Sequence, residues 1–347
     1  MKVKDFGKIS DGRSAHLYTL VNANGMKVDI TDIGAAIRSI RIPDENGDKV
    51  DVVLGYDEAL PYETGDKFFG ATVGRFAGQV KDACFTMNGE TYKLPKNDGP
   101  NCLHGGDHGF KTRLFDVEVI DDSSVKCTYV SPDLEEGFPG NLKLEVVYKL
   151  NDSNGIEIHY NAVSDKDTIL NITNHSYFNL DGSENVLDHY LTIDADRFTP
   201  DNSDGMPYGD IFDVEGTPMD FRQPHNVGER MEADYEQVHI FHGYDHNFCL
   251  NAPLSLEKAK VILENPTRTR RLEVYTDYPG VQLYTGNFLG RDNDKGKGNK
   301  PFSLRQALCL ETQMWPNAYG NEAFPNVVIK KGEHYKHNTE YRFIWKY

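Results

Sequence analysis

Residues 142–160 read LKLEVVYKLNDSNGIEIHY, and their pattern is the strongest structural signal in the chain. Apolar residues alternate with mostly polar ones from Leu142 to Leu150, and the alternation resumes at Ile156. A period of two is typical of a β-strand that buries one face. Asn154-Gly155 separates the two runs, and this dipeptide suits the positive φ angles of a tight turn. These residues therefore predict an antiparallel hairpin.

The same turn chemistry recurs along the chain, at Asn24-Gly25, Asn46-Gly47 and Asn88-Gly89. Helical signals are few and short, and only residues 229–236 and 255–260 could each form a turn or two. The sequence shows no alternation of strands and helices of the kind that a parallel sheet requires. We therefore predict an all-β protein with a few short helices, folded as one large antiparallel β-sandwich domain over residues 1–347.

Composition narrows the possible partners. The chain has 37 basic and 54 acidic residues, for a formal net charge of −17. Nucleic acids and anionic membranes both reward clustered Lys and Arg, so neither is expected as a partner. The five cysteines are an odd number without a CxxC pair, which favours reduced thiols. With no apolar leader and no run of membrane-spanning length, we predict a cytoplasmic protein.

A candidate proton-transfer site is suggested by two polar residues that follow apolar runs. His175 lies among asparagines and aromatic residues, where a strand built from Ile169, Leu170 and Ile172 should end. Glu311 follows the apolar run 307–310. A histidine and a glutamate in one cavity could exchange protons with a substrate without a metal or cofactor. Each residue alone would more commonly be a hydrogen-bonded strand end.

Histidine pairs with HxxxH spacing raise the question of a metal. They are His104 with His108 and His242 with His246. That spacing chelates most readily on a helix, and the glycines within both segments disfavour one. We expect no metal site here, and His104 is instead a loop residue whose donors would suit a sugar hydroxyl.

Two further polar residues accompany apolar strands. Asp245 directly precedes the strand-like residues around Phe248, where a turn role competes with acceptance of hydrogen bonds from sugar hydroxyls. Gln282 lies on the face opposite Val281 and Leu283, so that it could point into a cavity or into water. Neither residue is specific by itself.

Taken together, these motifs resemble those of the aldose 1-epimerases, the galactose mutarotase family. The resemblance runs nearly end to end, through Gly34-Ala35-Ala36, Val53-Leu54-Gly55-Tyr56, Thr72-Val73-Gly74-Arg75, Leu103-His104-Gly105-Gly106, Thr173-Asn174-His175-Ser176-Tyr177-Phe178-Asn179-Leu180, Thr217-Pro218-Met219-Asp220, Tyr244-Asp245-His246, Pro279-Gly280-Val281-Gln282 and Leu310-Glu311-Thr312-Gln313. It implies a β-sandwich of the galactose mutarotase type.

The resemblance also implies an activity, the interconversion of the α and β anomers of galactose or glucose by ring opening and closure. It assigns the general acid to His175 and the general base to Glu311, and it assigns sugar-hydroxyl binding to His104, Asp245 and Gln282. We expect His175 to be protonated and Glu311 ionised near neutral pH. Tyr177 is a further candidate for contact with the sugar. An aldohexose is the expected partner, no cofactor is implied, and the protein would be a monomer or homodimer.

One departure from the family concerns the sugar contacts. The family commonly has Asn-Arg where this chain has Gly78-Gln79, so a neutral amide replaces a cationic fork. Gln79 could still donate a hydrogen bond to a sugar. Three other functions stay open from the sequence: an epimerase of phosphorylated hexoses, a sugar-binding protein without catalysis, and a metal-dependent enzyme.

Overall fold

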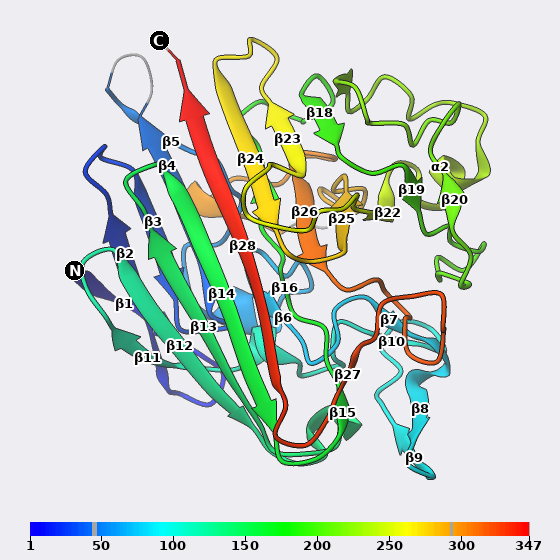
Figure 1. Cartoon of the computed structure of the whole chain (residues 1–347). Coiled ribbons are helices and arrows are strands. Elements are labelled where there is room, and N and C mark those ends of the chain that lie inside the picture. Colours follow the sequence, from blue (N-terminus) through cyan, green and yellow to red (C-terminus); the bar gives the residue numbers. More distant parts are fainter. Residues whose placement is uncertain (44–46, 292–293, 347) are drawn as a thin grey trace.

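Antiparallel β-sheet dominates the computed structural model, which describes residues 1–43, 47–291 and 294–346 (Figure 1). The hairpin expected at residues 142–160 is confirmed, since β13 (Leu142–Leu150) and β14 (Gly155–Ser164) pair in antiparallel register. Every second residue of β13 is buried, beginning with Leu142. The alternation in the sequence therefore corresponds to one face packed on the core.

In the part of the chain that the structure describes, the largest sheet has nine strands, in the order β11-β12-β13-β14-β28-β24-β23-β18-β21. Its other members are β11 (Asp116–Val119), β12 (Ser124–Ser131), β18 (Tyr190–Ile193), β21 (His225–Asn226), β23 (Val261–Glu264), β24 (Arg270–Thr276) and β28 (His334–Trp345). Figure 1 shows the red β28 between the green β14 and the yellow β24, with both of which it pairs. The last strand is thus a central one, and it joins segments that are far apart in the sequence.

A five-stranded sheet is formed by the first part of the chain, in sequential order. Its strands are β1 (Lys2–Lys8), β2 (Ser14–Val21), β3 (Lys27–Thr31), β4 (Ala36–Pro43) and β5 (Lys49–Asp51). The turn at Asn24-Gly25 joins β2 to β3 as expected. Asn46 of the second expected turn lies outside the described residues. The turn at Asn88-Gly89 joins β8 (Cys84–Met87) to β9 (Glu90–Lys93).

A six-stranded sheet carries much of the polar chemistry that the sequence singled out. Its order is β17-β26-β25-β22-β19-β20. The strands are β17 (Tyr177–Phe178), β19 (Arg197–Phe198), β20 (Phe212–Asp213), β22 (Asp245–Cys249), β25 (Gly280–Tyr284) and β26 (Leu308–Gln313). One buried cluster joins Ile40 of β4, Val146 of β13 and Leu310 of β26. The sheets therefore share a core, and the expected sandwich is confirmed.

The prediction of one continuous strand at residues 169–172 is wrong, because the chain changes its pairing strand there. It forms β15 (Thr168–Ile169), β16 (Thr173–Asn174) and then β17. These pair in turn with β27 (Val328–Ile329), β6 (Thr72–Val73) and β26. A fourth short pair joins β7 (Gln79–Val80) to β10 (Cys102–Leu103). The segment that leads to His175 therefore pairs with three parts of the chain in succession.

The helices are short, as expected, but their positions differ from those expected. They are α1 (Leu60–Thr64), α2 (Glu236–Phe241) and the 3₁₀ turns η1 (Lys81–Ala83), η2 (Phe110–Thr112), η3 (Glu135–Gly137) and η4 (Lys297–Asn299). Residues 229–234 form turns and bends, and α2 begins only at 236, where Gln237 and Val238 become buried. Residues 255–260 form no helix, since Ser255 bridges to Thr276. Within the described ranges, no helix has the length and apolar character needed to span a bilayer.

Candidate active site

One cavity of about 260 Å³ collects all of the polar residues to which the sequence reading assigned a site role. They are Gln79, His104, His175, Tyr177, Asp245, Gln282 and Glu311. A larger open groove of about 570 Å³, lined by residues such as Val80 and Tyr208, contains none of them. Residues separated by more than 200 positions in the sequence thus converge on the smaller cavity, which is the candidate active site.

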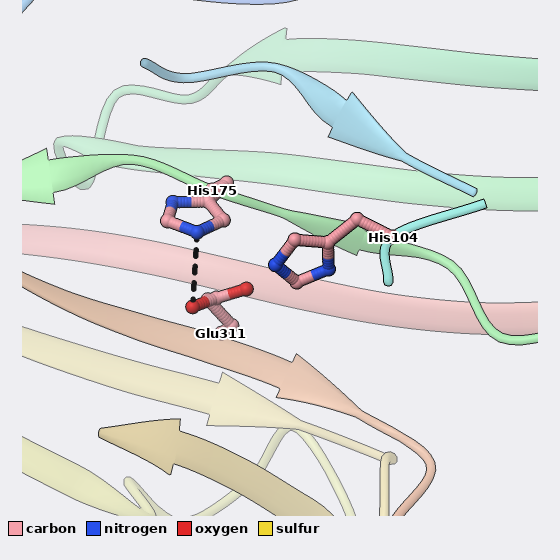
Figure 2. A group of neighbouring side chains, drawn as sticks. All are labelled: His104, His175 and Glu311. Atoms are coloured by element: carbon pink, nitrogen blue, oxygen red, sulfur yellow. Dashed lines mark ion pairs between the residues drawn. The ribbon is translucent and has the colours of Figure 1, made fainter. Parts of the chain in front are cut away.

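His175 and Glu311 face each other across this cavity. Their Nε2 and Oε1 atoms lie 3.4 Å apart, and the two side chains are 6% and 3% exposed (Figure 2). Backbone hydrogen bonds fasten His175 on both sides, because its N–H donates to Ala71 and its carbonyl accepts from Gly70. Glu311 lies within β26, which is buried along its whole length. Both groups are therefore held in place before any ligand binds.

Aromatic rings surround the imidazole of His175. The ring of Tyr177 stacks on it with a centroid distance of 5.0 Å, and the ring of Phe68 stacks at 5.7 Å. Phe68 has a φ of +56°, which is uncommon for a bulky residue. Such a conformation persists only where the surrounding structure enforces it, and it is often found at functional sites. Phe68 was not identified from the sequence, where no motif marks it.

A second group of side chains supplies hydrogen-bond acceptors. Gln282 pairs in register with Glu311, and its Nε2 donates to Asp245 Oδ1 at 2.9 Å. Gln282 Oε1 and Glu311 Oε2 are buried without a hydrogen-bond partner among the described residues. Buried acceptors without donors are unfavourable, so this wall of the cavity is suited to a ligand with several hydroxyl groups.

The opposite wall presents a donor, because the backbone of Gly78 orients His104. The Gly78 N–H donates to His104 Nδ1 at 3.1 Å, while the His104 N–H donates to the Gly78 carbonyl at 3.0 Å. An imidazole that accepts at Nδ1 carries its proton on Nε2 when neutral, and Nε2 faces Glu311 (Figure 2). A Cβ on Gly78, whose φ is +74°, would lie 2.6 Å from Pro316 Cβ. Glycine is therefore required by the geometry around this residue.

Gln79 lies beside Gly78 and lines the cavity. Its Nε2 donates to the carbonyl of Gly205 at 3.3 Å. The side chain thus reaches across to the 201–207 loop, which engages one of the two N–H groups of its amide. Gln79 therefore provides no positive charge, but the second N–H of its amide is left for a ligand in the cavity.

Burial favours the uncharged forms of His175 and Glu311. It lowers the pKa of His175 to about 4. Burial, aided by the negative charge of Asp245, raises the pKa of Glu311 well above its usual range. This differs from the expectation of a protonated histidine and an ionised glutamate near neutral pH. The uncharged pair and the expected ion pair have the same number of protons, however. They differ only in whether Glu311 or His175 holds the proton that can be transferred between them.

The described residues could place three ligand atoms around a cation. Ligand atoms of His104, His175 and Glu311 all lie within 4.8 Å of one another. A metal ligand must offer an unprotonated nitrogen, whereas the hydrogen bond from Gly78 leaves the proton of His104 on the nitrogen that faces the cavity. Metal binding would cost His104 that hydrogen bond. The arrangement is therefore better suited to hydrogen bonding than to ligation.

Asp245→Asn is expected to stabilise the protein, increasingly so as the pH rises. Burial raises the pKa of Asp245 from 3.8 to about 7. The unfolded chain therefore loses this proton at a lower pH than the folded chain, which favours unfolding as the pH climbs from 4 through 7. Asparagine does not titrate. Urea titrations should show a free energy of unfolding higher than that of the wild type by up to roughly 4 kcal/mol at pH 8, and much less at pH 4.

Asp277→Asn is the control for this experiment, with the opposite sign. Despite its burial, hydrogen bonds from His337 and Asn338 lower the pKa of Asp277. Its carboxylate therefore stabilises the fold at neutral pH, and the stabilisation is lost as the pH falls through the lowered pKa. The variant should be less stable than the wild type at pH 8 and nearly equal to it in acid. A difference independent of pH for Asp245→Asn would contradict the prediction.

Comparisons with known proteins agree on one relationship. The family model for aldose 1-epimerase matches residues 16–342. The galactose mutarotase of Bos taurus is 41% identical over 97% of both chains, and the aldose 1-epimerase of Escherichia coli is 37% identical over 96% of both. Among solved structures, an aldose epimerase homologue from C. elegans superposes with a TM-score of 0.89 at 29% identity, over 96% of this chain and all of the other. A galactose 1-epimerase from Lactobacillus acidophilus gives 0.87 at 29% identity over the whole of both chains.

Proposed function

The chain belongs to the aldose 1-epimerase family, a family of isomerases, and from this we propose that it interconverts the α and β anomers of galactose and glucose, with Glu311 as base and His175 as acid. The observation that carries the proposal is the 3.4 Å separation of His175 Nε2 and Glu311 Oε1 inside the cavity. Anomer exchange needs one group that removes the proton of the C1 hydroxyl and another that protonates the ring oxygen. The two side chains can fill these roles together.

The charge states of the pair support a single cycle of proton transfers. In the reactive arrangement Glu311 is a carboxylate and His175 an imidazolium. As the ring opens, Glu311 takes the C1 hydroxyl proton and His175 gives its proton to the ring oxygen. The products of these transfers are a neutral acid and a neutral imidazole, the forms that burial favours. Rotation about the C1–C2 bond and reversal of both transfers then close the ring on the other face.

The remaining cavity residues suit a neutral sugar. His104 presents an N–H, Asp245 and Gln282 present acceptor oxygens, and the ring of Tyr177 supports the acid. A phosphorylated hexose would require a cluster of cations, but no arginine is among the described residues that line the cavity, and Lys67 there pairs with Asp66 at 2.9 Å. We assign these residues to binding of the hydroxyls of an unphosphorylated aldohexose.

The cellular setting is proposed on separate grounds. All five cysteines are free thiols, and four of them are buried. Reduced cysteines are typical of proteins in a reducing compartment. We propose a cytoplasmic enzyme whose residues 1–347 act as one domain without a cofactor.

Polarimetry on freshly dissolved α-D-galactose and α-D-glucose tests the function. The purified protein is expected to speed the decay of optical rotation to an unchanged final value, because an isomerase cannot shift the equilibrium. The ratio of the two rates gives the sugar preference, and added chelator should leave both rates unchanged. Sugar binding without acceleration would instead favour a non-catalytic sugar-binding protein, and acceleration lost in chelator would favour a metal-dependent enzyme.

A further inference from the structure

Gln313 is the last residue of β26, two positions after Glu311, and it lines the cavity. The residue as a whole is only 1% exposed. Its Oε1 atom is buried, and no described residue donates a hydrogen bond to it. A buried amide oxygen without a donor is rare, because it loses its water without a replacement. Its position in the cavity suggests that the missing donor belongs to the ligand.

The strand geometry directs Gln313 to the same side as the acid–base pair. Side chains two residues apart share one face of a strand, so Cys309, Glu311 and Gln313 form one row. Cys309 Sγ lies 3.4 Å from His175 Nδ1, and Glu311 lies 3.4 Å from the other nitrogen of the same ring. Along a strand Gln313 follows Glu311 by about 7 Å, roughly the length of a sugar ring. A pyranose whose C1 end contacts Glu311 can thus reach Gln313 with a hydroxyl farther along the ring.

The backbone after Gln313 is held firmly by hydrogen bonds to one buried side chain. The Met314 N–H donates to Asn171 Oδ1 at 2.8 Å, and Asn171 Nδ2 donates to the Met314 carbonyl at 3.0 Å. Asn171 also donates to the carbonyl of Ala77, one residue before Gly78. One buried side chain therefore ties Gln313 to the segment that carries Gly78 and Gln79. A buried side chain on a backbone fixed in this way has less freedom to lose when a ligand binds.

We propose that Gln313 is a sugar-binding residue that accepts a hydrogen bond from one ring hydroxyl and helps to determine which aldoses are accepted. The inference rests on the proposed function and adds a residue to it. Three glutamines, Gln79, Gln282 and Gln313, line the cavity, and none of them is charged. Amides can both donate and accept, as hydroxyls can, so these three positions offer the sugar neutral groups where its family commonly uses an arginine as well.

Gln313→Met tests the assignment, because methionine has a similar length and no acceptor of comparable strength. The KM for D-galactose is expected to rise about tenfold, the effect of one lost hydrogen bond, with kcat changed less than threefold. The variant is then compared with the wild type on 2-deoxy-, 3-deoxy-, 4-deoxy- and 6-deoxy-D-galactose. For the sugar that lacks the partner hydroxyl, the two proteins should have equal KM values. A role confined to folding would affect all of the sugars alike.

Gln306→Met is the matched control, since Gln306 lies outside the catalytic cavity and its Oε1 accepts from the Ser303 N–H. It should leave the KM for every sugar unchanged. If Gln313→Met unfolds, Gln313→Asn replaces it, because asparagine keeps the amide but withdraws it by one methylene and should raise KM in the same sugar-dependent way. An unchanged KM, or an equal rise for all five sugars, overturns the proposal. Wild-type protein that does not exchange galactose anomers overturns the proposed function instead.

Discussion

Glu311→Gln is expected to lower kcat for anomer exchange by about 10²–10⁴-fold while leaving the Kd for sugar within about threefold. Glutamine has the shape of glutamate and keeps an oxygen that can accept from a hydroxyl, but it cannot remove the C1 proton. The Oε2 atom of Glu311 is buried without a partner among the described residues, so this carboxyl is free to act on a substrate. Polarimetry gives kcat, and isothermal titration calorimetry at equilibrium gives the Kd.

A matched control separates loss of chemistry from loss of structure. Glu340 lies in β28, is 5% exposed and pairs with Arg342, and it does not line the cavity. Glu340→Gln should lower stability slightly and leave kcat unchanged. If Glu311→Gln retained wild-type turnover, Glu311 could not be the base. If it lost sugar binding to the same degree as turnover, its role would be in binding.

His175→Asn should lower kcat by a comparable factor, about 10²–10⁴-fold, because asparagine cannot donate a proton to the ring oxygen. Its amide is smaller than the imidazole that Tyr177 and Phe68 contact, so some loss of thermal stability is expected as well. The melting temperature and the Kd for galactose are therefore measured beside kcat. Turnover should fall far more than the affinity for the sugar.

The double variant with Glu311→Gln tests whether the two groups act as a unit. If one proton transfer cannot proceed without the other, the double variant should be little worse than the poorer single variant. His189→Asn is the control for loss of a buried histidine, since His189 accepts from the Leu180 N–H outside the cavity. It should cost stability but not turnover. Losses that multiply in the double variant would show that the two residues act independently.

Much of the fold was predictable because short-range patterns dictate it. The alternation from Leu142 to Leu150 and the turn at Asn154-Gly155 are local properties, and both correspond to β13 and β14. The segment around His175 was less predictable. Its strand is broken into three, because the partners of β15, β16 and β17 come from β27, β6 and β26. Partner choice depends on long-range packing, which no window of sequence reports.

The residues of the candidate site were likewise predictable from the sequence only in part. His104, His175, Asp245, Gln282 and Glu311 were identified from motifs, and all five line one cavity. Phe68 was missed, because its position depends on a positive φ that the sequence does not signal. Gln313 could have been found, since the period of a strand directs it to the same face as Glu311. The sequence could not reveal that the Oε1 atom of Gln313 would have no hydrogen-bond donor among the described residues.

The sequence by itself determined the fold class, the family and the chemical types of the site residues, because these depend on local patterns and on residue identity. Tertiary structure alone decided the charge states and the orientation of the site. His175 and Glu311 titrate as they do because packing removes water from both. His104 presents its N–H because the backbone of Gly78, 26 residues earlier, occupies the other nitrogen. Burial and contacts between distant residues arise only when the sheets assemble, so the chemistry of this cavity is a property of the folded chain.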